Sequence, residues 1–162
     1  MSIVNSFFKK NLINKGVNRY NPIPISVANY SPHKYFNNVL YISGQLPMVD
    51  GKLKYIGKIG KDINEEDLED SILICVSNIL WNVSYFIENT NQKVAHVGCL
   101  NLKGYFNATN SYEEHSKLLD KASTLIVDVL GPELGKHSRL AIGCASLPRN
   151  SPVEIEAIFS IL

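Results

Sequence analysis

No acidic residue precedes Asp50 in this 162-residue chain, although the chain holds 15 acidic residues in all. The same acid-free stretch carries five of the 16 basic residues, which are Lys9, Lys10, Lys15, Arg19 and Lys34. The formal net charge of +1 therefore combines a basic first third with an acidic remainder. A basic segment is typical of a targeting peptide, a nucleic-acid-binding arm or a solvated surface, and the charge alone does not choose among these.

Cysteine is also scarce, and long apolar runs are missing. Cys75, Cys99 and Cys144 are widely spaced and flanked by apolar residues, which argues against a disulfide framework or a paired-cysteine metal site. No continuous apolar run reaches the roughly 18 residues that cross a bilayer, and residues 1–16 lack a secretory signal pattern. We therefore expect a cytoplasmic protein, with organellar import through the basic N-terminus as the alternative.

The chain length fits one globular domain with a sizeable core. Residues 3–15 have helical apolar spacing and predict a short N-terminal helix, and the prolines of residues 21–24 then predict an extended connector. Residues 39–43 are β-branched and aromatic and predict a strand, with a bend or a close backbone approach at Ser43-Gly44. Asp50-Gly51 lies between two apolar runs and predicts a hairpin.

Two longer helices are expected in the rest of the chain. Asn64 is a helix-capping residue followed by three acidic residues, and apolar residues then recur every three or four positions to residue 89. Ser111 and Glu114 have capping-box spacing and predict the start of the second helix, which ends at Gly131-Pro132. Strands are predicted at residues 94–106, 138–145 and 153–161, the last two joined as a terminal hairpin.

This order of elements predicts an α+β sandwich, in which a mixed sheet carries two helices on one face, with the short N-terminal helix added to it. The predicted strands are apolar on both sides. The face of the sheet without helices therefore needs a cover, and we expect other subunits to supply it in an oligomer.

Familiar catalytic signatures are missing from the sequence. It contains no phosphate-binding loop, dinucleotide-binding glycine motif, zinc-protease motif or nucleophile elbow. The four histidines are scattered singly, which is more typical of structural or surface roles than of metal ligands. We expect neither a metal nor a cofactor.

Arg139 and two glutamates are the most informative polar residues. Arg139 opens a strand of small apolar residues, where a guanidinium can bind a carboxylate or phosphate bidentately, or else pair with Glu154 or Glu156. The two glutamates stand two apart in a strand and so share one face. They have the chemistry for acid–base catalysis, although a merely solvated pair is the more common arrangement.

Several of these residues together resemble a known family. The resemblance rests on Ser43-Gly44-Gln45-Leu46-Pro47, on Arg139, and on the C-terminal stretch Leu147-Pro148 with residues 153–158. With their spacing, these elements resemble the reactive-intermediate deaminase family, also called RidA, YjgF-like or L-PSP endoribonuclease proteins. The resemblance covers residues 25–162. Ala28-Asn29-Tyr30 and the stretch from Gly51 to Lys58 are similar to the longer branch, which has an N-terminal extension.

The resemblance implies a chorismate-mutase-like fold and a homotrimer with a cleft at each subunit interface. It implies enamine and imine substrates, which water converts into 2-oxo acids and ammonia without a metal or a cofactor. In this chain Arg139 would hold the substrate carboxylate and Tyr30 would line the cleft. Ser43 and Gly44 would add polar contacts, and Glu154 would place the hydrolytic water.

Two positions depart from the deaminase pattern. Ala141 stands where a cysteine is common, although only its backbone is used there. Asp120 stands near an amide of the substrate-binding cleft, where a second carboxylate would repel a carboxylate substrate. Both are kept as candidate substrate-binding residues. In the expected terminal hairpin, Arg139 and Glu154 lie roughly 15–20 Å apart, so either a neighbouring subunit supplies one of them or Glu154 is not catalytic.

Three functions remain open at this stage. The first is a deaminase, the second a non-catalytic protein that binds a carboxylated metabolite, and the third an endoribonuclease, for which the sequence offers no evident histidine pair. We divide the chain into an extension at residues 1–24 and one domain at residues 25–162. Most of the acid-free stretch then belongs to the cleft-forming domain, which suits an anionic ligand better than a membrane or a nucleic acid.

Overall fold

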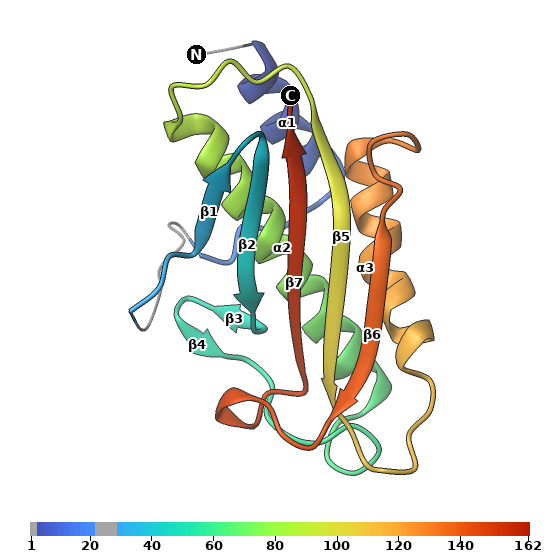
Figure 1. Cartoon of the computed structure of the whole chain (residues 1–162). Coiled ribbons are helices and arrows are strands. Elements are labelled where there is room, and N and C mark those ends of the chain that lie inside the picture. The colour runs from blue at the N-terminus through green and yellow to red at the C-terminus, as the bar shows by residue number, and fades with distance from the viewer. Residues whose placement is uncertain (1–2, 22–28) are drawn as a thin grey trace.

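The structure is a computed structural model that describes residues 3–21 and 29–162 (Figure 1). Residues 22–24 of the predicted connector and the boundary between residues 24 and 25 therefore lie outside the described residues. Helices and strands follow in the order α1 (Ile3–Asn14), β1 (His33–Phe36), β2 (Val39–Gln45), β3 (Met48–Val49), β4 (Lys52–Leu53), α2 (Glu65–Asn89), β5 (Val97–Asn107), α3 (His115–Leu130), β6 (Ser138–Cys144) and β7 (Val153–Ile161), with a 3-10 turn at Pro148–Asn150.

The main sheet has five strands in the order β1-β2-β7-β5-β6. Strands β5 and β6 are parallel and the other pairs are antiparallel, so the sheet is mixed as predicted. Helices α2 and α3 cover one face of the sheet, and α1 lies near one end of the helix layer (Figure 1). The predicted fold class is confirmed.

The predicted terminal hairpin is wrong, because β5 lies between β6 and β7. Helix α3 returns the chain to the end at which β5 began, so β6 adds beside β5 in parallel. Strand β7 then takes the central position between β2 and β5, where every second side chain is buried, from Val153 to Ile161. The hairpin was inferred because β6 and β7 are adjacent in sequence. The alternating apolar residues of β7 instead favour a central position in the sheet.

Two local predictions also need correction. Strand β1 was not predicted, although Asn37 and Asn38 both have positive φ, at 48° and 61°, as a two-residue hairpin turn requires. Helix α3 begins at His115 rather than at Ser111. The backbone amide of Tyr112 donates to the Thr109 carbonyl, and this turn takes up the residues that the capping-box pattern assigned to the helix.

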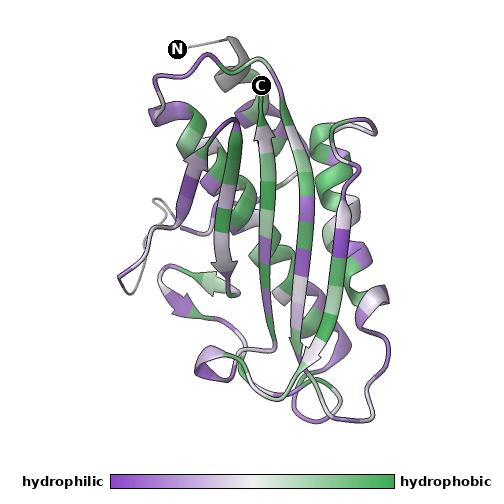
Figure 2. Ribbon diagram, viewed as in Figure 1, coloured by the Kyte–Doolittle hydropathy of each residue, from purple (hydrophilic) through white to green (hydrophobic). Residues whose placement is uncertain are grey.

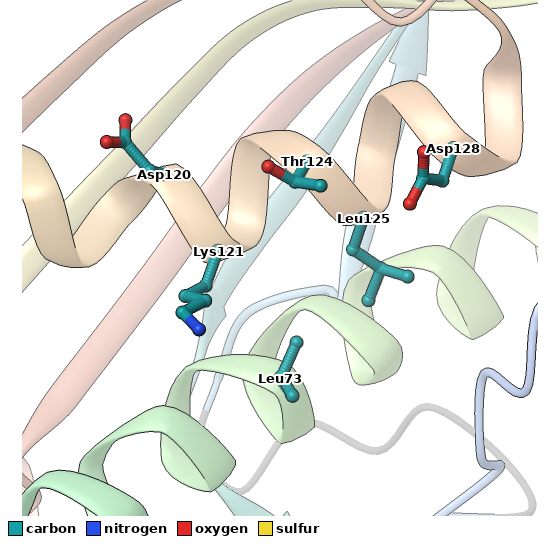
Figure 3. Close-up of a pocket in the computed structure, with 6 residues that line it drawn as sticks. All are labelled: Leu73, Asp120, Lys121, Thr124, Leu125 and Asp128. Carbon is teal, nitrogen blue, oxygen red and sulfur yellow. The ribbon is translucent and has the colours of Figure 1, made fainter.

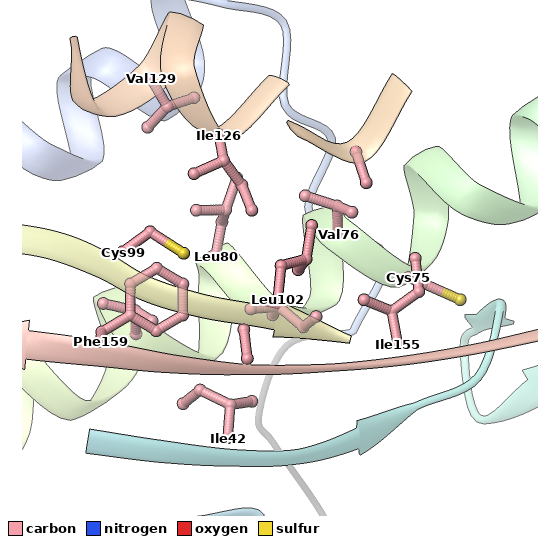
Figure 4. Packing of buried hydrophobic residues seen from close by; sticks show 14 of the residues in the cluster. Ile42, Cys75, Val76, Leu80, Cys99, Leu102, Ile126, Val129, Ile155 and Phe159 are labelled. Carbon is pink, nitrogen blue, oxygen red and sulfur yellow. The ribbon is translucent and has the colours of Figure 1, made fainter. Parts of the chain in front are cut away.

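The caps of α2 and α3 are otherwise as predicted. The Asn64 side chain accepts a hydrogen bond from the amide of Asp67, and Gly131 ends α3 with a φ of 85°. Helix α2 is apolar along most of its length and packs over the middle of the sheet. Figure 4 shows Val76 and Leu80 of this helix near Leu102 and Phe159 of the sheet.

By length and composition alone, α2 is apolar enough to cross a membrane. However, 78% of its most apolar window is buried inside this fold. The helix serves here as the core helix of the domain.

Hydrophilic and hydrophobic residues both occur along the strands of the sheet (Figure 2). One face of the sheet lies opposite the helices. The strand register places on this face Tyr41 beside Ile158, Lys103 beside Leu140, and Tyr105 beside Ile142. We call this surface the open face. Its large apolar side chains are substantially exposed: Phe36 at 65%, Tyr41 at 47%, Leu140 at 45% and Ile142 at 38%.

Candidate functional site

Ser43, Gly44 and Glu154 lie together at one end of β2. The pairing of β2 with β7 shifts register between Ile42 and Gln45, so Ser43 and Gly44 form a bulge opposite β7. The Glu154 carboxylate is packed directly against Gly44, and a side-chain carbon at that position would overlap it. The close backbone approach predicted at Ser43-Gly44 is thus an approach by a carboxyl group.

Glu154 lies in an unfavourable place for a charge. Burial is the main cause that raises its pKa above the ordinary value, and the neighbouring carboxylate of Glu156 raises it further. Glu156 itself is paired with Lys103 at 2.7 Å and accepts a longer hydrogen bond from the Tyr105 hydroxyl. The two glutamates share the open face as predicted. Among the described residues, Glu156 is held by an ion pair, whereas no ion pair or side-chain hydrogen bond holds Glu154.

A Gly44→Ala substitution should displace the Glu154 carboxylate, because the added methyl group would occupy its place. The side chain of Glu154 is flexible enough to turn away, so the protein should fold with nearly unchanged stability. We expect the binding or turnover that depends on Glu154 to fall by at least about tenfold. Thermal unfolding and activity measured on the same preparation check this prediction, and equal loss of both would contradict it.

Tyr30 lies in the segment that leads into β1 and is 49% exposed. This segment is fixed to the bulge by two hydrogen bonds, from the Ser43 amide to the Pro32 carbonyl and from the Ser43 hydroxyl to the Ser31 carbonyl. Ser43 therefore positions the loop that carries Tyr30. We call Tyr30, Ser43, Gly44 and Glu154 the glutamate group.

Arg139 lies elsewhere, on the helix-covered side of the edge strand β6. Its guanidinium is 2.7 Å from the carboxylate of Asp120 and donates to the hydroxyls of Ser116 and Ser123, both at 3.2 Å. Neither of the partners expected from the sequence, Glu154 or Glu156, pairs with it. Ala141 lies two residues along β6 on the same side, level with Gly104 of β5. We call Arg139, Asp120 and Ala141 the arginine group.

The two groups are separate within one chain. Arg139 is level with Leu102 of β5, which faces the helices, whereas Glu154 is level with Tyr105, which faces away from them. Three residue steps along the sheet and two strand spacings across it put their backbones about 14 Å apart, on opposite faces. Arg139 and Glu154 are thus apart in one chain as expected, although their separation is slightly below the roughly 15–20 Å expected and the hairpin from which that was inferred does not form.

Sequence reasoning missed Ser116, Ser123 and His137 around the arginine. Ser116, Asp120 and Ser123 have the spacing i, i+4 and i+7, which places them on one face of a helix. That polar stripe was the available signal. Ser116, Asp120 and Ser123 face Arg139 on the edge strand β6.

A groove of about 460 Å³ lies between α2 and α3. Leu73 and Leu125 contribute apolar surface to it, and Asp120 and Asp128 lie along α3 (Figure 3). The Asp120 carboxylate points away from Leu73, which fits its ion pair with Arg139. Asp120 thus lies between the groove and the arginine group, while Arg139 and Ala141 do not line the groove. In the part of the chain described, no cluster of three or more His, Cys, Asp or Glu residues could hold a metal ion.

Comparison with known proteins defines the class. Residues 10–160 match the model of the YjgF/chorismate mutase-like family, whose description also names an endoribonuclease. The chain belongs to this family.

A crystal structure of Atu1372 from Agrobacterium tumefaciens, a protein described as having unknown function, is similar with a TM-score of 0.80 and 35% identity, covering 98% of this chain and 94% of the other. A protein from Shewanella oneidensis that bears the name endoribonuclease is similar with a TM-score of 0.81 and 26% identity, over 96% and 99% of the two chains. Protein TCP17 of Trypanosoma cruzi is 29% identical over 134 residues, which is 83% of this chain and 82% of that protein.

Proposed function

We propose that this protein hydrolyses carboxylate-bearing enamines and imines to 2-oxo acids and ammonia, in clefts that form between subunits of a homotrimer. The observation that carries the proposal is the half-buried Glu154 carboxyl, held against a bare glycine backbone with its pKa raised. The raised pKa favours protonation of this carboxyl group, and a carboxyl group so placed can exchange its proton with a ligand. Membership in the YjgF/chorismate mutase-like family supports a small-molecule site of this kind.

The reaction needs little from the protein. Water adds to the electrophilic imine carbon, and one of its protons passes through Glu154 to the substrate nitrogen, which gives a carbinolamine. The hydroxyl proton of the carbinolamine then passes to the same nitrogen by the same route, and the carbon–nitrogen bond breaks to leave the 2-oxo acid and release ammonia. An enamine first takes a proton on carbon to become the imine. Arg139 fixes the substrate carboxylate, which orients the imine carbon toward the water.

Arg139 retains capacity for a ligand although it is already bonded. The hydrogen bonds in the described part of the chain use two donors of one terminal nitrogen and one donor of the other, out of the five that a guanidinium carries. Its side chain is 30% exposed on the edge strand. A carboxylate can therefore bind beside Asp120 without breaking the existing contacts.

In a trimer, the arginine group and the glutamate group of different subunits could meet. The open face is too apolar to be left in water, and its exposed side chains Phe36, Tyr41, Leu140 and Ile142 offer a contact surface. Packing of one subunit's sheet edge against the next would bring the arginine group of one chain to the glutamate group of its neighbour. We therefore assign each half of the cleft to a different subunit.

The test couples the purified protein to a pyridoxal-phosphate-dependent dehydratase, which releases enamine and imine intermediates, and follows 2-oxo acid formation. We expect release to be faster than the spontaneous rate and to scale with the protein concentration. An unchanged rate of release would contradict the proposal.

A carboxylate-binding protein without turnover is the second candidate, and the ion pair of Asp120 with Arg139 favours it. Saturable binding of 2-oxo acids with no acceleration of release would support this role. The endoribonuclease activity named in the family description has no favouring cluster among the described residues. RNA decay that persists in an Arg139→Ala variant and disappears on further purification would identify a contaminant.

Replacing Asp120 with asparagine should strengthen carboxylate binding, because it removes the charge that competes for Arg139. An exposed ion pair of this kind is worth up to about 1 kcal/mol, so we expect an affinity gain of about two- to fivefold. Titration calorimetry with a 2-oxo acid measures this gain. Asp128→Asn on the same helix, away from Arg139, is the control, and a weaker affinity in Asp120→Asn would show that Asp120 assists binding.

A further inference from the structure

Ser123, His137 and Arg139 form a hydrogen-bonded chain that the proposed deamination does not use. The Ser123 hydroxyl lies 3.1 Å from Nε2 of His137, and Nδ1 of the same ring lies 2.6 Å from the carbonyl oxygen of Gly135. The Arg139 guanidinium donates to the Ser123 oxygen from the other side at 3.2 Å. Three elements meet here, namely α3, the α3–β6 loop and β6.

The partners determine where the protons lie. A carbonyl oxygen can only accept, so Nδ1 of His137 carries a proton that it donates to Gly135. In the neutral ring, Nε2 has a free lone pair and accepts the hydroxyl proton of Ser123.

This arrangement is that of an activated nucleophile. A serine needs an adjacent base, and the base needs a third group to fix its tautomer and orientation. His137 is the base here, and the Gly135 carbonyl fixes its tautomer. The Arg139 guanidinium stabilises negative charge that develops at the Ser123 oxygen or on the group that it attacks.

We propose that Ser123 is an acylatable serine that attacks activated acyl esters bearing a carboxylate. The Ser123 oxygen bonds to the acyl carbon while its proton passes to Nε2 of His137. The alcohol then leaves as its bond to the acyl carbon breaks, and it takes that proton from His137. Water, activated by the same ring, later releases the acyl group as a carboxylic acid and restores the serine.

The substrate class follows from the surroundings of Ser123. Arg139 offers remaining donors for a carboxylate on the acyl chain, within a few ångströms of the nucleophile. Ser123 and His137 are half-buried, so a small ester can reach them and bulk water has limited access. The proposal shares Arg139 with the proposed deamination, but it uses residues of a single chain and needs no subunit contact.

The test uses para-nitrophenyl hemisuccinate, an activated ester with a free carboxylate, and the full-length protein. We expect a burst of about one equivalent of nitrophenolate per chain, and mass spectrometry of the digest should find the succinyl group on Ser123. Ser123→Ala should lose the burst and the adduct. His137→Gln should slow acylation by about 100-fold or more, which is the contribution of a general base.

Thr124→Ala is the control, because Thr124 is the next hydroxyl on α3 and is exposed beside the groove between α2 and α3. It should acylate at the rate of the unsubstituted protein. An adduct confined to lysines, or equal burst rates in Ser123→Ala and Thr124→Ala, would overturn the proposal. Nitrophenolate and adduct mass do not depend on 2-oxo acid release, so failure of this proposal is distinguishable from failure of the deaminase proposal.

Discussion

Arg139→Ala should reduce 2-oxo acid release in the coupled assay by about 100-fold, because removing one partner of a hydrogen-bonded charge pair costs about 2 to 5 kcal/mol. Arg139 lies on an edge strand with a side chain only 30% exposed, so a substrate carboxylate bound there would be partly shielded from water. Saturation by substrate should disappear together with the rate.

The same substitution should leave the fold intact. Arg139 is paired with Asp120, whose side chain is 62% exposed. Because an exposed ion pair contributes little to stability, the free energy of unfolding should change by no more than about 1 kcal/mol. Arg149→Ala is the matched control, since it removes an exposed arginine from the β6–β7 connection. Equal activity of Arg139→Ala and the control would exclude Arg139 as the anchor.

Arg139→Lys separates charge from geometry. Lysine keeps the positive charge but cannot form the two parallel hydrogen bonds that a guanidinium gives a carboxylate. We expect affinity between that of the alanine variant and that of the unsubstituted protein. Full activity with lysine would show that Arg139 acts only through its charge.

Glu154→Gln should lower turnover by about 100-fold or more while it raises stability at neutral pH. Glutamine has nearly the same shape and can still lie against Gly44, but it cannot carry a proton between water and the leaving nitrogen. Its neutral side chain also removes the half-buried charge that Glu156 opposes. A gain of stability with a loss of function is typical of a catalytic residue in an unfavourable environment.

The pH dependence gives the sign of the stability effect. The folded protein binds the Glu154 proton more tightly than the unfolded chain does, because the folded-state pKa is raised. The free energy of unfolding therefore falls as the pH rises from the ordinary value of 4.5 through the raised value, and it stays lower above that range. Glu154→Gln should unfold at a higher temperature than the unsubstituted protein near pH 7, and at a similar temperature below pH 4.5.

Glu133→Gln provides the control for this measurement, because Glu133 is an exposed carboxylate beyond the end of α3. Its thermal midpoint should follow that of the unsubstituted protein at every pH. A Glu154→Gln variant that is less stable at neutral pH would show that the carboxylate is held by favourable contacts rather than tolerated at a cost.

Much of the fold was readable from local signals. The Asn64 cap, the apolar periodicity of α2 and the Gly131 terminus each follow from chemistry within a few residues, and each is confirmed. The position of β7 was not readable in this way. Sequence adjacency suggested a hairpin with β6, whereas burial of its alternate side chains placed it in the centre of the sheet.

The candidate site was predictable as a set of residues but not as an arrangement. The contact of Glu154 with Gly44 fits the expected close approach at Ser43-Gly44, because only glycine leaves room for that carboxylate. The partner of Arg139 was missed, since Asp120 comes from another element whose facing side depends on tertiary packing. Ser123 and His137 were missed for the same reason.

The most direct test of the shared cleft mixes two inactive variants. Arg139→Ala and Glu154→Gln chains, carrying different tags, are unfolded together, refolded and purified as mixed oligomers through both tags in turn. If each cleft takes its arginine from one subunit and its glutamate from the next, every mixed trimer that carries both tags has one cleft with both residues intact, which is about one third of its clefts. We predict recovery of about that fraction of the activity, and mixed oligomers that remain as inactive as either parent would contradict a cleft shared between subunits.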